Sequence, residues 1–305
     1  MKAMSGKNAA SRRLARQCVA FALAGLAMAL ALLGVFVALQ AHAQARPERS
    51  EVGGNRPAST LWVGNSFFYS NNSMHSHVEA LAQAADAMRP MRGVSVTISG
   101  SGLDWHDLES YFRPDAIGRY AFDDDNQVVF AARPPRFDAV IMMDCSQCPI
   151  HPQLSRQFHE TVRRQSEVVI RHGARPVLFM SWAYANKPGM TVRLAEQYTL
   201  AGNANDTLVI PAGLAFARAI ASRPDIGLYQ PDQRHPSMRG TYLAACTAFA
   251  AMTQQSPIGN AYTADIAPAT AAFLQSMAWE TVQAYYASVR PNFHSHDYLL
   301  KVAEP

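Results

Sequence analysis

The stretch STLWVGNSFFYS, residues 59–70, says more about the fold than any other part of the chain. Its first half, Thr60–Val63, is a short apolar run of the kind that forms a buried β-strand. The run stops at Gly64, Asn65 and Ser66. Glycine and asparagine tolerate turn conformations and serine caps helices, so an ordinary turn from strand to helix is one interpretation. The other is that Ser66 is a nucleophile held at the carboxyl end of a strand.

The first 43 residues have the pattern of a secretory leader. Five basic residues and no acidic one precede the apolar run Val19–Leu39, and Ala41-His42-Ala43 is a small-x-small cleavage site. The apolar run is also long enough to serve as an uncleaved membrane anchor. The expected organisation is a signal peptide over residues 1–43, a flexible linker over 44–58, a folded domain over 59–290 and a C-terminal tail over 291–305.

The leader also accounts for the basic charge of the chain. The 305 residues include 27 basic and 23 acidic side chains. Without the five basic residues of the leader, 22 remain against 23 acidic ones, a net charge of −1. A chain without basic excess has no electrostatic attraction to nucleic acid. We therefore expect an exported protein, periplasmic or secreted in a bacterium, that touches a membrane only through an uncleaved leader.

Short apolar runs alternate with helical patterns along the rest of the chain. This alternation predicts an α/β protein, a three-layer α/β/α sandwich with a mainly parallel five-stranded sheet. The segment Asp104–Arg136 is irregular and predicts a helix followed by a long excursion. The predicted strands are Thr60–Val63, Val94–Ser99, Ala139–Met143, Pro176–Met180 and Thr207–Ile210.

Residues that can carry chemistry follow these strands. Ligands of such sheets bind beyond the carboxyl ends of the strands, so Ser66, Gly100 and Gln147 are expected near one another, with Asp232 and His235 from a later loop. Histidine can take the serine proton, and an aspartate can hold the histidine in the required tautomer. The backbone N–H groups of Ser66 and Gly100 and the amide of Gln147 can stabilise an oxyanion. This inventory predicts nucleophilic acyl transfer.

The sequence resembles the SGNH (GDSL-type) hydrolases over residues 59–286. Ser66 in WVGNSFF matches the first block of that family, with Asn65 in place of Asp, and Asp232 and His235 in YQPDQRHPSMRGTYLAA match its last block, Asp-x-x-His. The resemblance implies a flavodoxin-like fold, a Ser66–His235–Asp232 triad, and ester hydrolysis without cofactor or metal. The third block departs from the usual Gly-x-Asn-Asp, and Gln147 stands where Asn is usual. A branch with a Gly-Asn-Ser-Phe first block is closer.

The cysteines leave several interpretations open. Cys145 and Cys148 form a C-x-x-C, which can be a disulfide, a redox pair or two reduced thiols. We favour a disulfide that stiffens the loop carrying Gln147, with Cys246 left free and buried. The pairs His75/His77 and His294/His296 lack the ligand framework of a metal site, so we expect no metal. A structural role is expected for His106.

The sequence therefore predicts an exported serine esterase. Its substrate would be a small-molecule or carbohydrate ester, and an O-acetyl group on a carbohydrate or cell-envelope polymer is the first to test. One alternative is a non-catalytic protein that holds a glycan or lipid in the same cleft. The other is a thiol–disulfide protein that uses Cys145 and Cys148.

Overall fold

The computed structural model describes residues 45–118, 120–287 and 289. The predicted leader, residues 1–43, and tail, residues 291–305, lie outside this part. No helix in the described part is long and apolar enough to cross a membrane. The strands are β1 (Ser59–Gly64), β2 (Arg92–Thr97), β3 (Tyr120–Phe122), β4 (Val128–Phe130), β5 (Ala139–Met142), β6 (Arg175–Phe179) and β7 (Leu208–Ile210). The α-helices are α2 (Ser66–Tyr69), α3 (Met74–Ala85), α4 (Leu108–Tyr111), α5 (Ser155–Arg171), α6 (Met190–Ala204), α7 (Ala212–Ser222), α8 (Met238–Thr253) and α9 (Pro268–Tyr286).

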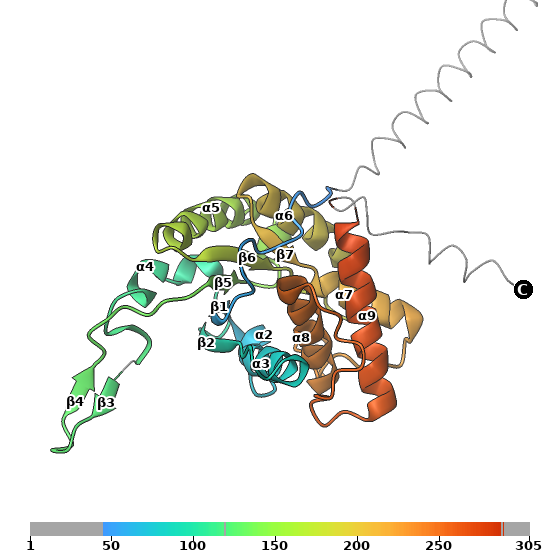
Figure 1. The fold of residues 1–305 in the computed structure, drawn as a ribbon. Coiled ribbons are helices and arrows are strands. Elements are labelled where there is room, and N and C mark those ends of the chain that lie inside the picture. The colour runs from blue at the N-terminus through green and yellow to red at the C-terminus, as the bar shows by residue number, and fades with distance from the viewer. Residues whose placement is uncertain (1–44, 119, 288, 290–305) are drawn as a thin grey trace, which may run out of the picture. The chain divides into compact units, whose positions relative to one another are not determined.

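Five strands form one sheet in the order β2-β1-β5-β6-β7, and every neighbouring pair is parallel. Counted along the chain, this is the 2-1-3-4-5 order of flavodoxin-like folds. Helices α5 and α6 cover one face, and α3 and α8 cover the other, with α7 and α9 packed against α8 (Figure 1). The predicted α/β/α sandwich is confirmed. All the carboxyl ends of the strands lie at one edge, which is the edge that can hold a site.

The central strands are buried because the sheet is covered on both faces. All of β5 and every residue of β1 after Ser59 are buried. Trp62 of β1 and Phe179 of β6 pack edge-to-face with Phe68, with ring centroids 5.2 and 5.0 Å from it. Continuous apolar runs are typical of such doubly covered parallel strands. This core fixes the position of the residues that follow β1.

The N-terminal segment before β1 is packed, not flexible. Val52 belongs to the hydrophobic core, and the side-chain amide of Gln254 donates to the carbonyl oxygen of Ser50 at 2.8 Å. Arg49 forms a two-pronged ion pair with Asp206, with N–O distances of 2.8 and 2.7 Å. The folded unit begins at Arg46. We expected a flexible linker over residues 44–58, but from residue 45 onward this segment is packed against the domain. Its polar, glycine-containing composition disfavours helices and strands, but it does not prevent the segment from packing on the core.

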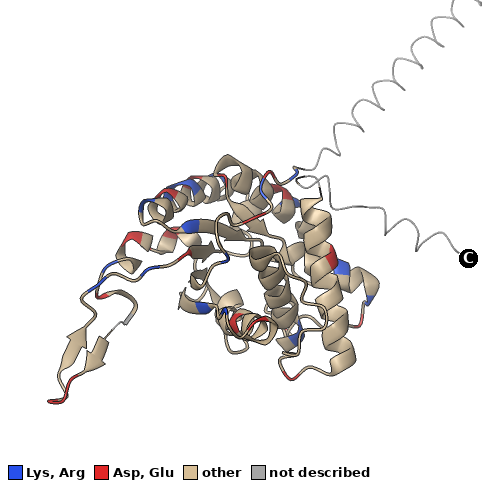
Figure 2. Cartoon of the chain, viewed as in Figure 1, with Lys and Arg blue, Asp and Glu red and all other residues tan. Residues whose placement is uncertain are grey.

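The irregular segment between β2 and β5 contains a hairpin that the sequence patterns did not predict. Antiparallel strands β3 and β4 pair Tyr120 with Phe130 and Phe122 with Val128. Asp123 Oδ1 closes the turn by accepting from the backbone of Gln127 at 2.8 Å. The hairpin stands apart from the five-stranded sheet in Figure 1, and Figure 2 shows acidic residues at its tip. The predicted helix is present only as the four residues of α4.

Candidate active site

The junction of β1 and α2 presents Ser66 at the carboxyl edge of the sheet. Gly64 is needed there because a Cβ atom would lie 2.9 Å from the Phe68 ring. Asn65 is the N-cap of α2, and its Oδ1 accepts from the backbone N–H of Phe67 at 3.2 Å. Ser66 is therefore the first residue of a short helix that starts directly after a buried strand.

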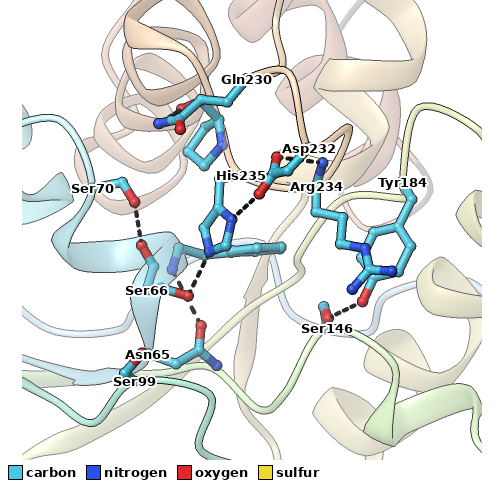
Figure 3. A network of polar contacts seen from close by, with 12 residues as sticks. Asn65, Ser66, Ser70, Ser99, Ser146, Tyr184, Gln230, Asp232, Arg234 and His235 are labelled. Atoms are coloured by element: carbon cyan, nitrogen blue, oxygen red, sulfur yellow. Dashed lines mark hydrogen bonds and ion pairs between the residues drawn. The ribbon is translucent and has the colours of Figure 1, made fainter.

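Ser66, His235 and Asp232 lie in one chain of hydrogen bonds. The Nε2 atom of His235 is 2.8 Å from Oγ of Ser66, and its Nδ1 atom is hydrogen-bonded to Oδ2 of Asp232 (Figure 3). Ser66 and His235 are 169 positions apart in the sequence. The fold thus brings together the three side chains that the sequence motifs singled out.

The charge on Asp232 sets the tautomer of His235. The hydrogen bond from His235 lowers the pKa of Asp232 to about 2, and the backbone N–H groups of Arg234 and His235 also donate to its carboxylate at 3.0 Å. A carboxylate that is ionised at neutral pH accepts only, so the proton of the neutral imidazole lies on Nδ1. Nε2 is then free to accept the proton of the Ser66 hydroxyl.

The loop that carries His235 is held on several sides. The Phe67 ring meets the His235 ring edge-to-face at 5.5 Å, and it stacks on Trp182 at 4.7 Å. The indole N–H of Trp182 donates to the carbonyl oxygen of Arg234 at 3.0 Å. Within the loop, the backbone N–H of Gln230 donates to the carbonyl oxygen of His235 at 2.9 Å. These contacts limit the movement of the imidazole relative to Ser66.

Asn65 joins the ends of three neighbouring strands. Its amide Nδ2 donates to the carbonyl oxygens of Ser101, after β2, and Asp144, after β5, at 3.0 and 3.3 Å. An aspartate carboxylate has no hydrogen to donate, so it cannot make these two bonds. These two bonds explain why position 65, next to Ser66, is Asn in this chain and not Asp. From the sequence, Asn65 was interpreted as a turn residue and as the replacement for Asp in the first block, but not as a residue that joins strand ends, because its burial is not visible in the sequence.

His106 supports the same strand end. It is buried, and its Nε2 lies 3.0 Å from the carbonyl oxygen of Gly64, while Nδ1 lies 3.0 Å from the hydroxyl of Tyr111. Burial lowers the pKa of His106, which favours the neutral ring. The structure places His106 in a supporting position behind Ser66, in line with the structural role expected from the sequence.

Two of the oxyanion candidates are backbone N–H groups. Gly100 is exposed and has a φ of +70°, a conformation that favours glycine. The turn that contains Gly100 is hydrogen-bonded to α2, since the Tyr69 hydroxyl donates to Ser99 Oγ at 3.1 Å. Within the described part of the chain, the N–H groups of Ser66 and Gly100 have no hydrogen-bond acceptor. Both are available to a ligand.

The third oxyanion candidate, Gln147, turns toward another residue. Its Nε2 donates to the hydroxyl of Tyr184 at 3.0 Å, and Ser146 Oγ lies 2.6 Å from the same hydroxyl. Gln147 makes no hydrogen bond to Ser66 or His235 in this structure. Its amide still has a second N–H. Tyr184, on the loop after β6, is a site residue that sequence reasoning missed, because nothing in the motifs marks it.

The cysteines of the third block form a disulfide. Cys145 and Cys148 are joined across three positions, and the free Cys246 is buried in α8. Asp144 lies beside the disulfide and completes a group whose possible metal ligands are within 4.8 Å of one another. Disulfide sulfurs are not thiolates, so this group does not fit a metal ion. His77 is engaged with Tyr262 and Asn71, while His294 and His296 lie outside the described residues.

Comparison with known proteins gives structural neighbours only. No family model and no curated protein matches the sequence. The solved structures that it resembles include a DUF4886 family protein from Bacteroides uniformis, with 18% identity, a TM-score of 0.49, and coverage of 77% of this chain and 95% of that one. Another is a member of the lipolytic protein G-D-S-L family from Veillonella parvula, with 13% identity, a TM-score of 0.46, and coverage of 65% and 99%.

A third neighbour is a single-residue mutant of Axe2, a Geobacillus acetyl-xylooligosaccharide esterase. It has 16% identity and a TM-score of 0.47, over 66% of this chain and 95% of that one. The likeness to these structures is one of fold alone. Identities at this level do not carry an activity from one protein to another. The function has to be argued from the site itself.

Proposed function

We propose that this protein is an exported serine esterase that acts through Ser66, His235 and Asp232. The observation that supports the proposal is the unbroken hydrogen-bond chain from Asp232 through His235 to Ser66 at the carboxyl edge of a parallel sheet. This edge is where folds of this type bind ligands. The order of the three side chains in this hydrogen-bond chain is the one expected of a nucleophile, its base and the group that orients the base, which supports these roles.

The reaction follows from this geometry. Oγ of Ser66 attacks the ester carbonyl while Nε2 of His235 takes the hydroxyl proton, and Asp232 stabilises the resulting imidazolium. The tetrahedral intermediate collapses, the C–O bond to the alcohol breaks, and the alcohol leaves with the proton from His235. Water then attacks the acyl-enzyme by the same route and releases the acid. The proposed reaction needs no cofactor and no metal.

The oxyanion would be held by the N–H groups of Ser66 and Gly100. Both lack a protein acceptor in the described part of the chain. Gln147 would be the third donor to the oxyanion, through the amide hydrogen that it does not donate to the Tyr184 hydroxyl. Loss of one oxyanion donor typically lowers kcat by about 10²–10³. Gln147→Ala is therefore expected to lower kcat for 4-nitrophenyl acetate by this factor.

An O-acetyl group on a carbohydrate or cell-envelope polymer is the proposed substrate to test first. The expectation rests on the secretory leader, since an exported esterase meets such polymers. Attachment to a membrane would come only from an uncleaved leader.

The test uses the chain expressed with its leader and purified from the exported fraction, with the mature N-terminus read by mass spectrometry. Labelling by a fluorophosphonate and hydrolysis of 4-nitrophenyl acetate are measured for the wild type, Ser66→Ala and His235→Ala. Wild-type labelling at Ser66 is expected, and each variant should lose at least about 10³-fold in kcat/KM. Ser76→Ala is the matched control, because Ser76 is an exposed serine on α3.

Two results would contradict the proposal. A folded wild type that neither labels nor turns over, but binds glycan or lipid, would be a binding protein on the same fold. Activity that survives Ser66→Ala and disappears in Cys145→Ser would indicate thiol–disulfide chemistry.

A further inference from the structure

Arg234 stands between the two triad residues of the last loop, and its side chain is exposed. Its guanidinium carbon lies 4.9 Å from the centre of the Tyr184 ring. Figure 3 shows the side chain running from the loop of Asp232 across Tyr184 toward Ser146. A cation held over an aromatic face is attracted to it and is partly ordered there.

The backbone of Arg234 is anchored while its charged group is left open. Its N–H donates to Asp232 Oδ1 at 3.0 Å, and its carbonyl oxygen accepts from Trp182 at 3.0 Å. Among the residues that the structure describes, no carboxylate lies within 4.0 Å of the guanidinium. The carboxylate of Asp232 is engaged by His235 and by backbone N–H groups.

Three loops contribute hydrogen-bonding groups to the same place. Arg234 comes from the loop before α8, Tyr184 from the loop after β6, and Ser146 and Gln147 from the turn closed by the disulfide. The Tyr184 hydroxyl binds both Ser146 and Gln147, at 2.6 and 3.0 Å. Stacking on the ring leaves the planar N–H edge of the guanidinium accessible, and that edge matches a carboxylate.

We propose that Arg234, seated on Tyr184 beside Ser146, forms a subsite that binds a carboxylate group of the ester substrate. This inference rests on the proposed esterase function and narrows its substrate to acidic esters. The carboxylate can belong to the acyl group or to the alcohol, since the acyl chain and the alcohol oxygen are both bonded to the carbonyl carbon that Ser66 attacks. Either source offers the same two oxygens to the guanidinium.

The catalytic test compares paired substrates. 4-Nitrophenyl hemisuccinate is set against 4-nitrophenyl butyrate for an acid on the acyl side, and 4-acetoxybenzoate against 4-acetoxybenzamide for an acid on the alcohol side. In Arg234→Gln, the ratio of kcat/KM for the acidic to the neutral ester is expected to fall about tenfold in one pair, the size of one charge-assisted hydrogen bond. The pair that responds identifies where the carboxylate sits.

Arg223→Gln is the matched control. Arg223 also lies over an aromatic ring, with its guanidinium carbon 4.1 Å from the centre of Phe273, and it follows the last residue of α7. Arg223 takes no part in the hydrogen bonds that the described residues make to the three triad residues. The substitution removes the same charge and should leave both ratios unchanged. An equal fall in both variants, or no fall in Arg234→Gln, would overturn the subsite.

A binding experiment separates this inference from the esterase itself. Two uncleavable amide pairs are titrated calorimetrically into Ser66→Ala and into Ser66→Ala/Arg234→Gln: N-phenylsuccinamic acid with butyranilide for the acyl side, and 4-acetamidobenzoate with 4-acetamidobenzamide for the alcohol side. Tighter binding of the acid in one pair, lost in the double variant, supports the subsite even if the wild type hydrolyses nothing. Equal binding within both pairs, or a preference that survives loss of Arg234, rejects the subsite even if Ser66-dependent turnover is found.

Discussion

At the scale of single residues, Asp144 connects two of the loops that form the candidate site. Its Oδ1 accepts from the backbone N–H groups of Leu103 and Cys145, at 2.9 and 2.6 Å, so it links the segments after β2 and β5. The side chain is almost fully buried, and burial raises its pKa from 3.8 to about 6 despite these two donors. Asp144 therefore holds the two loops together, but its ionised form is destabilised because the carboxylate is poorly solvated.

Replacing Asp144 with Asn is expected to stabilise the protein at high pH. A folded pKa above the unfolded value means that the stability due to protonated Asp144 is fully present below pH 3.8 and is lost as pH rises through about 6. Asparagine keeps the acceptor oxygen and does not ionise. The variant should gain up to about 3 kcal/mol at pH 8 but only about 0.5 kcal/mol at pH 4. Urea unfolding at both values checks this, and a gain independent of pH would contradict it.

At the scale of elements, the close approach of α8 to the preceding loop positions His235. Gly240, in the first turn of α8, leaves no room for a side chain, since a Cβ atom would lie 2.3 Å from the carbonyl oxygen of Leu228. Ser237 caps the helix by accepting from the N–H of Gly240 at 3.3 Å. The loop of Asp232 and His235 lies between Leu228 and this helix start, so the contact sets where that loop returns to the sheet.

The same substitution at two glycines should therefore have opposite effects. Gly240→Ala is expected to cost about 3 kcal/mol in the free energy of unfolding and to lower kcat by displacing the His235 loop. Gly189 has a φ of −62° and open space around it, with no atom within 4 Å of the point where a Cβ would lie, so Gly189→Ala should stabilise by about 0.5 kcal/mol. Denaturant unfolding and 4-nitrophenyl acetate turnover measure both. Equal effects at the two positions would reject the steric argument.

At the scale of the whole molecule, the segment before β1 is part of the fold. It supplies Val52 to the core, and Arg175 donates to the carbonyl oxygen of Asn55 at 2.9 Å. Arg49 and Gln254 add the contacts to Asp206 and Ser50 described above. The hairpin β3–β4 is the opposite case, because its apolar side chains Tyr120, Phe122 and Phe130 remain exposed.

Shortening the chain at its N-terminus should therefore weaken the fold. A protein that begins at Ala58 is expected to lose about 3 kcal/mol against one that begins at Ala45, chiefly through the loss of buried Val52. Chemical denaturation of the two proteins measures the difference. Val52→Ala in the longer protein should reproduce a large part of the loss. Equal stability of the two lengths would mean that the segment behaves as the linker expected from its composition.

The elements that the sequence predicted are those with a strong local pattern. The predicted strand Thr60–Val63 lies within β1, and the strands around Val140 and Leu178 also agree closely, because buried parallel strands are continuous apolar runs. The hairpin β3–β4 was not predicted, since its strands have three residues each and both are exposed. The packed segment from residue 45 was missed because its contacts are made by distant residues such as Asp206.

The amino-acid sequence alone was enough to predict the α/β order and to name Ser66, Gly100, Asp232 and His235 as candidate site residues near the strand ends. Repeating apolar patterns and short motifs are local, so they can be interpreted without knowing which strands are neighbours. The folded chain was needed to show that Gln147 turns to Tyr184, that Asn65 joins three strand ends, and that Arg234 lies on an aromatic ring. Such contacts depend on strand order and on side-chain packing across many tens of residues, which local patterns do not encode.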